Sequence, residues 1–384
     1  MRVAVLGAGA MGARAAATLA AHPAVDSLVI ADINRDALEQ SAGTTMSART
    51  VDVTDGAALR ALLFDVNVVI STVGPFYRFG TAVLEASIDT STDYVDICDD
   101  WEPTGALLDL DAAAREANVC AVVGAGASPG LSTLLASAAA ARLDSVHNVF
   151  TAWPLDAPAT PIESTVTTSA AAVHWMHQCS GTVAEVSDGV LVRRRPVRAV
   201  ALTLPGGRSG TGYTVGHPEP LTLHRTMGPS GEAACLMLLR PTTAAYVDAL
   251  RSDIDAGFLT AEAAADLLDS PSIRHSLRSL PRSLRFAGPG TLPEFFAAAD
   301  GLVDGAPTRV SARLVADQAL FSDMAGLTGV PAALAAIQLV DGHRLVGVHP
   351  PDAALDQTRM LADFGVAFPG THVTVEEEPG WLTT

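Results

Sequence analysis

The chain has 384 residues, 49% of them hydrophobic, which is enough to bury a large core and predicts two domains. Its formal net charge of −18 argues against nucleic acid and anionic membrane surfaces as partners, since both require a basic footprint. All 24 basic residues are arginines. The absence of lysine excludes a Schiff-base enzyme, a P-loop nucleotide site and the Tyr-x-x-x-Lys pair of short-chain dehydrogenases.

No apolar run reaches membrane-spanning length, and the amino-terminal segment lacks the basic flank and cleavage site of a secretory signal. We therefore expect a cytoplasmic protein without a membrane partner. The four cysteines, at positions 98, 120, 179 and 235, are widely spaced and form no metal-binding pattern. The sequence thus predicts neither a metal site nor disulfides.

The first dozen residues combine a short apolar strand with a glycine-rich turn. Gly7, Gly9 and Gly12 have the G-x-G-x-x-G spacing of dinucleotide-binding turns. There the first glycine permits a tight turn, the second lets the backbone approach a pyrophosphate, and the third lets the next helix pack closely. An alanine-rich helix is expected over residues 13–21, with its first N–H groups facing the phosphates. We expect the dinucleotide to contact Gly7, Gly9, Ala10, Met11 and Gly12.

A second apolar stretch, residues 27–32, ends in Asp32, about twenty residues beyond the last glycine. An acid at this place hydrogen-bonds the ribose of NAD, and its charge repels the 2′-phosphate of NADP. The alternative is an aspartate that only caps a turn, which would leave the order of strand, glycines, helix, strand and acid as a coincidence. Asp32 therefore predicts NAD as the cofactor, while the nearby Arg35 leaves NADP open.

Strand and helix patterns alternate as far as residue 123. Strands are expected at residues 48–53, 66–73, 94–98 and 119–123, with helices between them. We expect Asp52 and Val53 to border the adenine, the alternative for Asp52 being a simple cap. The strand 66–73 ends in Val73, Gly74 and Pro75, which we expect to contact the cofactor.

A second glycine-rich turn, residues 124–132, again opens an alanine-rich helix. It has two interpretations: a second phosphate-binding turn, or a helix entry that joins two domains, which we favour.

The pattern changes from about residue 147. Strand-like segments joined by Gly/Pro turns predict a mixed or antiparallel sheet, at residues 148–153, 183–192, 199–204 and, later, 310–321. Helices are expected at residues 164–180 and over 242–280, where Thr260 is a plausible N-cap. The segment 242–280 has two interpretations, a lid or a subunit contact. A helix beginning at residue 329 and a strand at 372–376 close the chain.

Several motifs together resemble the saccharopine dehydrogenase-like family, which includes saccharopine reductases and lysine 6-dehydrogenases. They are Gly74-Pro-Phe-Tyr-Arg-Phe-Gly80, Tyr94-Val-Asp-Ile-Cys98 and Gly124-Ala-Gly-Ala-Ser-Pro-Gly-Leu-Ser132. The resemblance resumes near the carboxyl end, at residues 329–337 and 347–351, and is thinner between about 150 and 320. Saccharopine reductases usually have an Asp before the Pro of the second glycine turn, where this chain has Ser128. That departure argues against saccharopine itself as the substrate.

The resemblance implies an α/β fold: a Rossmann-type doubly wound parallel sheet with an inserted α+β domain built on a mixed sheet. The Rossmann domain would span residues 1–128 and be completed by about 322–384. The insert, 129–321, would bind substrate and form a homodimer. The resemblance also implies a nicotinamide cofactor and hydride transfer at a carbon that bears nitrogen.

Hydride transfer at such a carbon needs a proton donor or acceptor near the nicotinamide. Because ligands of open α/β sheets bind beyond the carboxyl ends of the strands, the candidates follow the strands of the amino-terminal domain. They are Tyr77, Asp96 and Asp99. Each has an alternative: wall packing for Tyr77, and helix capping for the two aspartates. Cys98 is a substrate contact or, as we favour, a small buried side chain.

Further residues are candidates for holding an amino-acid-like substrate. Arg225 and Arg240 offer planar guanidinium groups for its carboxylate, although most arginines are solvated. His174 and His177 would share a helix face, and with no third ligand nearby they suit substrate contact or structure better than a metal. Phe76 would line the pocket, and His217 and Glu219 are weaker candidates.

The sequence therefore predicts an NAD(P)-dependent oxidoreductase that acts on a C–N centre of a small amino-acid-derived molecule. The alternative is a non-catalytic protein that senses NAD(H) or serves as a scaffold.

Overall fold

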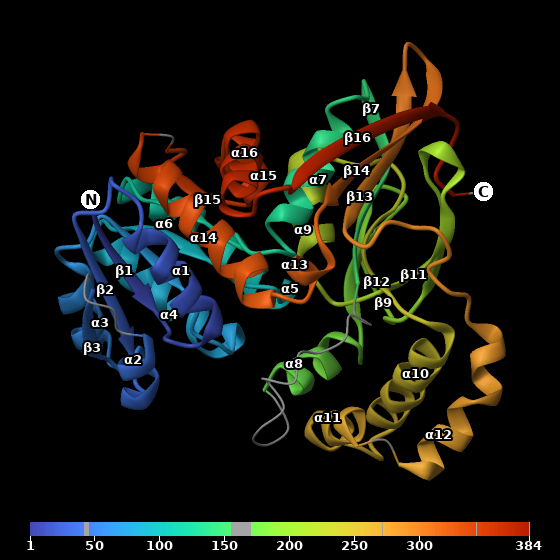
Figure 1. Cartoon of the computed structure of the whole chain (residues 1–384), viewed down its shortest axis with the longest axis horizontal. Coiled ribbons are helices and arrows are strands. Elements are labelled where there is room, and N and C mark those ends of the chain that lie inside the picture. The colour runs from blue at the N-terminus through green and yellow to red at the C-terminus, as the bar shows by residue number, and fades with distance from the viewer. Residues whose placement is uncertain (42–45, 155–169, 271, 343, 384) are drawn as a thin grey trace. The chain divides into compact units, whose positions relative to one another are not determined.

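The structure is a computed structural model that describes all residues except 42–45, 155–169, 271, 343 and 384. It divides into two compact units (Figure 1). Unit 1 comprises residues 1–134 and 316–372, and unit 2 comprises residues 135–315 and 373–384. Within the described part of the chain, no helix has the length and apolar character that crossing a membrane requires.

Unit 1 is built on a parallel sheet of seven strands in the order β15-β6-β5-β4-β1-β2-β3. Because the order runs outward from β1 in both directions, this is the predicted doubly wound Rossmann sheet. Every residue of β4 is buried, as expected for a strand covered on both faces. The strands are β1 (Arg2–Leu6), β2 (Ser27–Asp32), β3 (Ser47–Thr50), β4 (Val68–Ser71), β5 (Asp93–Asp96), β6 (Cys120–Val122) and β15 (Gly347–His349).

The carboxyl-terminal segment completes this unit through α14 (Met324–Val340), which packs against α1 (Ala10–Ala20). Gly329 makes the close approach necessary, since a Cβ there would lie 2.4 Å from the carbonyl oxygen of Met11. Between β5 and β6, where a helix was expected, the chain forms two helices, α5 and α6. The other helices are α2 (Arg35–Ser41), α3 (Gly56–Leu63), α4 (Phe76–Asp89), α5 (Trp101–Leu108), α6 (Asp111–Glu116), α13 (Gln318–Phe321), α15 (Pro351–Ala354) and α16 (Gln357–Ala367); α7 (Leu131–Ala140) crosses into unit 2.

Unit 2 contains the predicted mixed sheet, with nine strands. Seven lie in the order β10-β11-β12-β7-β13-β14-β16, and β8 joins β12 to β9. Strands β7 and β12 run parallel, whereas β7 and β13 run antiparallel. The strands are β7 (Ser145–Pro154), β8 (Val183–Ser187), β9 (Val190–Arg194), β10 (Ala199–Thr203), β11 (Ser209–Thr214), β12 (Ala233–Leu238), β13 (Phe296–Val303), β14 (Ala306–Val315) and β16 (His372–Pro379).

Two of the predicted strands are longer than any single strand that the structure has at those residues. Residues 183–192 form the hairpin β8–β9, which turns at Asp188 and Gly189, both with positive φ. The predicted strand 310–321 ends at Val315, and residues 318–321 form α13 instead.

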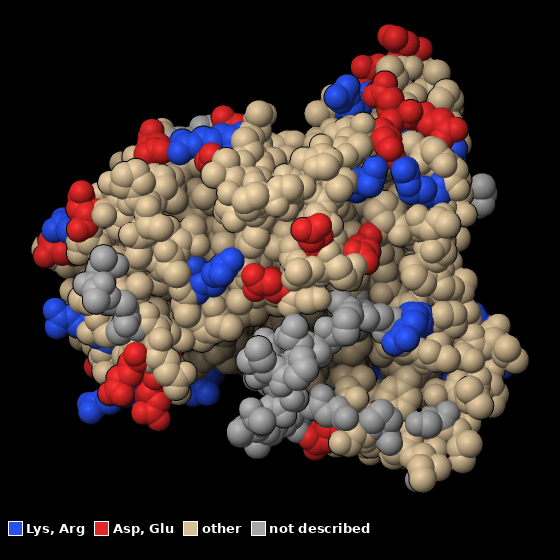
Figure 2. All heavy atoms as spheres, viewed as in Figure 1, with Lys and Arg blue, Asp and Glu red and all other residues tan. Residues whose placement is uncertain are grey.

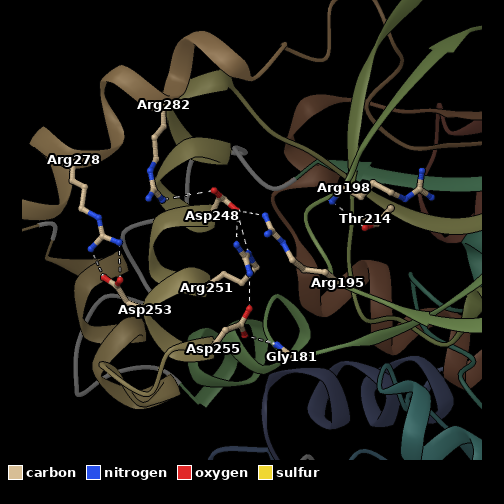
Figure 3. Close-up of polar contacts among 10 residues, drawn as sticks. All are labelled: Gly181, Arg195, Arg198, Thr214, Asp248, Arg251, Asp253, Asp255, Arg278 and Arg282. Carbon is tan, nitrogen blue, oxygen red and sulfur yellow. Dashed lines mark hydrogen bonds and ion pairs between the residues drawn. The ribbon is translucent and has the colours of Figure 1, made fainter.

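The segment 242–280 forms three helices of unit 2, α10 (Pro241–Asp255), α11 (Ala261–Asp269) and α12 (Ile273–Ser279). Thr260 caps α11 by accepting a hydrogen bond from the amide of Ala263. A set of charged contacts holds the segment (Figure 3). Arg251 of α10 is 4% exposed and donates to Asp248 and Asp255, while Arg278 of α12 makes a two-point ion pair with Asp253. The predicted helix 164–180 appears as α8 (Ala170–Gln178), its earlier residues lying outside the described part.

The end of the chain corrects the expectation that residues 322–384 all complete the Rossmann domain. Strand β16 pairs beside β14 in the sheet of unit 2. Arginines of unit 2 bind its acidic side chains: Arg208 lies 2.5 Å from Glu376, and Arg309 lies 3.1 Å from Glu378. Interspersed acidic and basic side chains are visible at the upper right of the face shown in Figure 2. This pairing accords with the placement of residues 373–384 in unit 2.

Candidate functional site

In the glycine turn after β1, Gly7 and Gly12 lie against other atoms, whereas Gly9 borders open space. Gly7 has a φ of +97°, which favours glycine. A Cβ at Gly12 would lie 1.9 Å from the carbonyl oxygen of Gly7, so no larger residue fits there. At Gly9 no described atom lies within 4 Å of the place of a Cβ. Because Gly9 is the N-cap of α1, and the first turn of α1 has no acidic residue, N–H groups face this open space and suit a phosphate.

Thr72, which the sequence did not single out, holds the turn. Its hydroxyl donates to the carbonyl oxygen of Leu6 at 2.9 Å and lies 3.3 Å from that of Gly7. The same oxygen would lie 2.6 Å from a Cβ at Gly12. Thr72 follows β4, and the parallel pairing of β4 with β1 brings it beside the turn. No signal in the sequence marks it, because a threonine at a strand end is common.

Asp32 lies at the end of β2, where two backbone amides fix its carboxylate. Oδ2 accepts from the amide of Ala8 at 2.6 Å, and Oδ1 accepts from the amide of Asn34 at 2.8 Å. Each carboxylate oxygen retains capacity for a further hydrogen bond, and the side chain is only partly buried. Asp32 therefore braces the glycine turn and still has capacity for ribose hydroxyls. The two interpretations of Asp32 from the sequence, ribose binding and turn capping, are therefore compatible.

Exposed side chains follow Asp32. Arg35, the first residue of α2, is exposed, and so is Ile33, at 65%. Nothing in the sequence marks Ile33, because an apolar residue beside a strand end is ordinarily part of the core.

Asp52 and Val53 follow β3. The Asp52 carboxylate accepts two hydrogen bonds, both from Thr54. Its Oδ1 accepts from the amide of Thr54 at 2.9 Å and from the hydroxyl of Thr54 at 2.7 Å. These hydrogen bonds lower the pKa of Asp52. The structure thus shows Asp52 shaping a turn, in agreement with the capping alternative, while Val53 is partly buried beside it.

Asp96, at the end of β5, is 0% exposed and accepts three hydrogen bonds. The donors are the hydroxyl of Tyr94 at 2.8 Å and the amides of Cys98 at 3.0 Å and Gly124 at 2.6 Å. Burial raises the pKa of Asp96 to about 6, although its hydrogen bonds act to lower it. This enclosure favours a positioning role: the carboxylate joins the segments that follow β5 and β6.

The neighbours of Asp96 differ strongly in exposure. Cys98 is fully buried, its thiol accepts a hydrogen bond from Thr104 at 3.5 Å, and burial holds the pKa of Cys98 well above its usual value. This agrees with a small buried side chain. Asp99 is partly buried. At the start of α4, Phe76 is 7% exposed while Tyr77 is 72% exposed, so of these two only Tyr77 offers its side chain to a ligand. Val73, Gly74 and Pro75 lead into α4 and are exposed or partly buried.

The second glycine turn uses its amides internally. The amide of Gly124 donates to Asp96, that of Ala125 to the Asp96 carbonyl oxygen at 2.7 Å, and that of Gly126 to the Pro129 carbonyl oxygen at 2.9 Å. Because these N–H groups are already hydrogen-bonded, the turn does not offer the anion site that the turn at Gly9 offers. The geometry favours the helix-entry interpretation.

The substrate candidates of unit 2 are dispersed. On α8, His174 is partly buried and lies 2.9 Å from the side-chain amide of Gln178, whereas His177 is exposed. Arg225 is exposed on α9 (Glu219–Met227), and Arg240 is exposed as the N-cap of α10. These four candidates thus belong to three different helices of unit 2, whereas the cofactor candidates of unit 1 follow the carboxyl ends of the parallel strands.

A doubly wound parallel sheet, with an open glycine turn after its first strand and an acid after its second, defines a Rossmann-type dinucleotide-binding protein. Residues 3–122 match the model of the saccharopine dehydrogenase NADP binding domain. The chain is similar to apo, histidine-tagged saccharopine dehydrogenase (L-Glu forming) from Saccharomyces cerevisiae, with 16% identity, a TM-score of 0.67, and coverage of 98% of this chain and 99% of that one. It also matches GenD2 from gentamicin A biosynthesis, solved in complex with NAD, at 14% identity and a TM-score of 0.42, covering 99% of this chain and 96% of that one.

Residues 3–122 carry an NADP-binding domain of the saccharopine dehydrogenase type, and the chain has the fold of saccharopine dehydrogenase. The predicted fold class is confirmed, and the match of residues 3–122 agrees with the predicted resemblance. NAD(P) is the cofactor that this domain binds, and the open turn at Gly9 fits its pyrophosphate. The domain is that of an NAD(P)-dependent oxidoreductase.

Proposed function

We propose that the chain is an NAD-preferring oxidoreductase that acts at a C–N centre of a small amino-acid-derived molecule. The observation that carries the proposal is the Asp32 carboxylate, fixed beside the glycine turn by the amides of Ala8 and Asn34. A carboxylate there accepts ribose hydroxyls and repels a 2′-phosphate.

The residues of unit 1 bind and orient the cofactor in this proposal. The N–H groups that follow Gly9, through Ala10 and Met11, hold the pyrophosphate. Ile33 offers an apolar surface to the adenine, with Arg35 and Val53 at its edge. When bound, the nicotinamide supplies hydride transfer. Val73, Gly74 and Pro75 would border it, and Asp96 would keep the segments after β5 and β6 in place.

Support for a C–N centre comes from the likeness to saccharopine dehydrogenase, and the departure at Ser128 argues for a substrate other than saccharopine. Tyr77 and Asp99 are the proposed groups for proton transfer, because they are less buried than Asp96 and Cys98. Arg225 and Arg240 are the proposed partners of a substrate carboxylate.

Nucleotide titration tests the cofactor assignment. We expect wild-type protein to bind NADH more tightly than NADPH, as measured by nucleotide fluorescence. Asp32→Ser should weaken NADH binding about tenfold, since it removes charge-assisted hydrogen bonds to the ribose. Asp65→Ser is a matched control, because Asp65 is exposed, precedes β4 at the opposite end of the parallel sheet, and forms an ion pair with Arg2 on the surface. Equal NADH affinity of wild type and Asp32→Ser would refute the ribose contact.

Turnover tests the activity. A panel of amino acids with NAD⁺, and of keto acids with ammonia or amines and NADH, should give a change in absorbance of the reduced nucleotide with at least one pair. Tight NADH binding without turnover across the panel would instead favour the sensor function.

We also propose a cytoplasmic homodimer. Its support is a stripe of exposed apolar side chains at helical spacing on α12 and the following turn: Ile273, Leu277, Leu280 and Leu284, each at least 62% exposed. Light scattering during gel filtration should give twice the chain mass, and Leu277→Asp should give the mass of one chain. A monomeric wild-type protein would refute the dimer.

A further inference from the structure

Three side chains with metal-binding chemistry meet inside unit 2, outside the site described above. His217, Glu219 and Cys235 each place one ligand atom within 4.8 Å of the other two. The imidazole Nδ1 lies 3.4 Å from the Glu219 Oε2. All three side chains are buried, since His217 is 4% exposed and Glu219 and Cys235 are 0% exposed.

The backbone brings them together through the junction between β11, α9 and β12. Cys235 lies within β12, and its carbonyl oxygen accepts a hydrogen bond from the amide of Val215 at 3.1 Å. The amide of Gly216 then donates to the carbonyl oxygen of Gln178 at 2.9 Å, which fixes the turn that precedes His217. Glu219 follows as the first residue of α9. Residues 217 and 219 thereby lie beside a cysteine that is distant in sequence.

Apolar side chains pack around much of the cluster. Cys235 belongs to a core cluster with Tyr213, Val215 and Met237, and the Trp153 ring lies 5.4 Å from the His217 ring at an interplanar angle of 32°. A buried carboxylate in such surroundings is costly unless it is paired or binds a metal ion. The cluster thus combines a carboxylate, an imidazole and a thiol where water has little access.

A second, independent observation comes from β7. Thr151 is the register partner of Cys235 across the parallel strands, so both side chains point to the same face of the sheet. Thr151 is 0% exposed, and among the described residues its hydroxyl has no hydrogen-bond partner. A buried polar atom without a partner, directly across the strands from Cys235 and on the same face, points to a group that the chain alone does not provide.

We propose that His217, Glu219 and Cys235 form a binding site for a zinc-class divalent cation. Thiolate, imidazole and carboxylate are the zinc ligands of proteins, and soft sulfur and nitrogen donors disfavour Ca²⁺ and Mg²⁺. With Zn–N and Zn–O bonds of about 2.0–2.1 Å, a tetrahedral ion sets its nitrogen and oxygen ligands about 3.3 Å apart, which matches the Nδ1 to Oε2 distance. Three protein ligands leave a fourth position for water.

Such an ion would join β12 to the start of α9, and its binding does not depend on NAD(P). The three ligands come from two segments that are distant in sequence, so we expect the ion to stabilise the fold of unit 2.

The test uses the full chain, freed of metal with a chelator and then titrated with Co²⁺ and, separately, Zn²⁺. We expect one equivalent of Co²⁺ to bind with a thiolate-to-cobalt charge-transfer band in the near ultraviolet, and Zn²⁺ to abolish that band. Cys235→Ser should lose the band and weaken metal binding by at least about 100-fold. Cys179→Ser is the matched control: Cys179 is a buried thiol of the same core cluster, 3.8 Å from the Met237 sulfur.

The wild-type titration decides the proposal even if a variant fails to fold. Absence of a charge-transfer band and of stoichiometric Zn²⁺ binding by wild-type protein would overturn it, as would an unchanged band in folded Cys235→Ser. NADH affinity, measured on the same samples, should be similar with and without Zn²⁺, so failure of this proposal is separable from failure of the proposed nucleotide site.

Discussion

The buried carboxylate of Asp96 gives the sharpest prediction, because asparagine preserves its contacts and removes its charge. In Asp96→Asn the side-chain oxygen takes the place of Oδ1 and accepts from the amides of Cys98 and Gly124. The new NH₂ group takes the place of Oδ2 and donates to the Tyr94 oxygen, which reverses one hydrogen bond. Alanine at the same position would remove all three hydrogen bonds.

The magnitude follows from the pKa of Asp96, which burial raises from 3.8 to about 6. The folded state then holds its proton more tightly than the unfolded state, so the group favours folding below about pH 4 and loses that contribution as the pH rises through 6. The full change is about 3 kcal/mol, of which about 1.4 kcal/mol falls between pH 5 and pH 7.5. Asparagine carries no such titration.

The assay is denaturant unfolding of wild type and Asp96→Asn at pH 5 and at pH 7.5. We expect the free energy of unfolding of the variant, relative to wild type, to increase by about 1.4 kcal/mol between the two pH values. Because hydrogen-bond differences contribute equally at both, they cancel. A relative stability that stays constant with pH would refute the reasoning. Once a substrate is known, a positioning role predicts that Asp96→Asn retains kcat within about threefold, whereas loss of an acid or base would cost about 100-fold or more.

Other predictions concern the glycine turn and a long-range ion pair. Gly9→Ala should raise the Kd for NADH at least about tenfold without changing Tm, because its Cβ enters open space where the pyrophosphate binds, whereas Gly12→Ala should lower Tm, because its Cβ would clash with the backbone. Thr72→Val should lower the free energy of unfolding by about 1 kcal/mol, and Thr72→Ser, which keeps the hydroxyl, should restore it. Arg344→Gln should lower it by about 2 kcal/mol, because Arg344 makes bonds of 2.6 and 2.8 Å to the nearly buried Asp93. An Arg344→Gln protein as stable as wild type in denaturant unfolding would contradict that role.

Local patterns were sufficient to predict the architecture of unit 1. The Rossmann order appears in the sequence because each buried parallel strand is a continuous apolar run, and because glycine spacing reports backbone conformation directly. The contact between Tyr94 and Asp96 could also be predicted, since residues two apart on a strand share a face. The hairpin β8–β9 was missed because its two-residue turn, Asp188-Gly189, lies inside an otherwise uninterrupted strand pattern.

Contacts between segments that are distant in the chain could not be predicted from the sequence. Thr72 meets the glycine turn only through the pairing of β4 with β1. Cys235 meets His217 and Glu219 only through the sheet of unit 2, so a scan for cysteine spacing finds no metal pattern there. Burial likewise separates Asp96 from Tyr77, two candidates that look equally polar in the sequence.

The contact between Gly329 and Met11 has a consequence for synthesis on the ribosome. Helix α1, which presents the glycine turn, packs on α14, so unit 1 lacks this support until about residue 340 has left the ribosome. All of unit 2 except its last strand emerges earlier. The nascent chain would therefore complete most of its inserted unit first and acquire its nucleotide site among the last steps of folding.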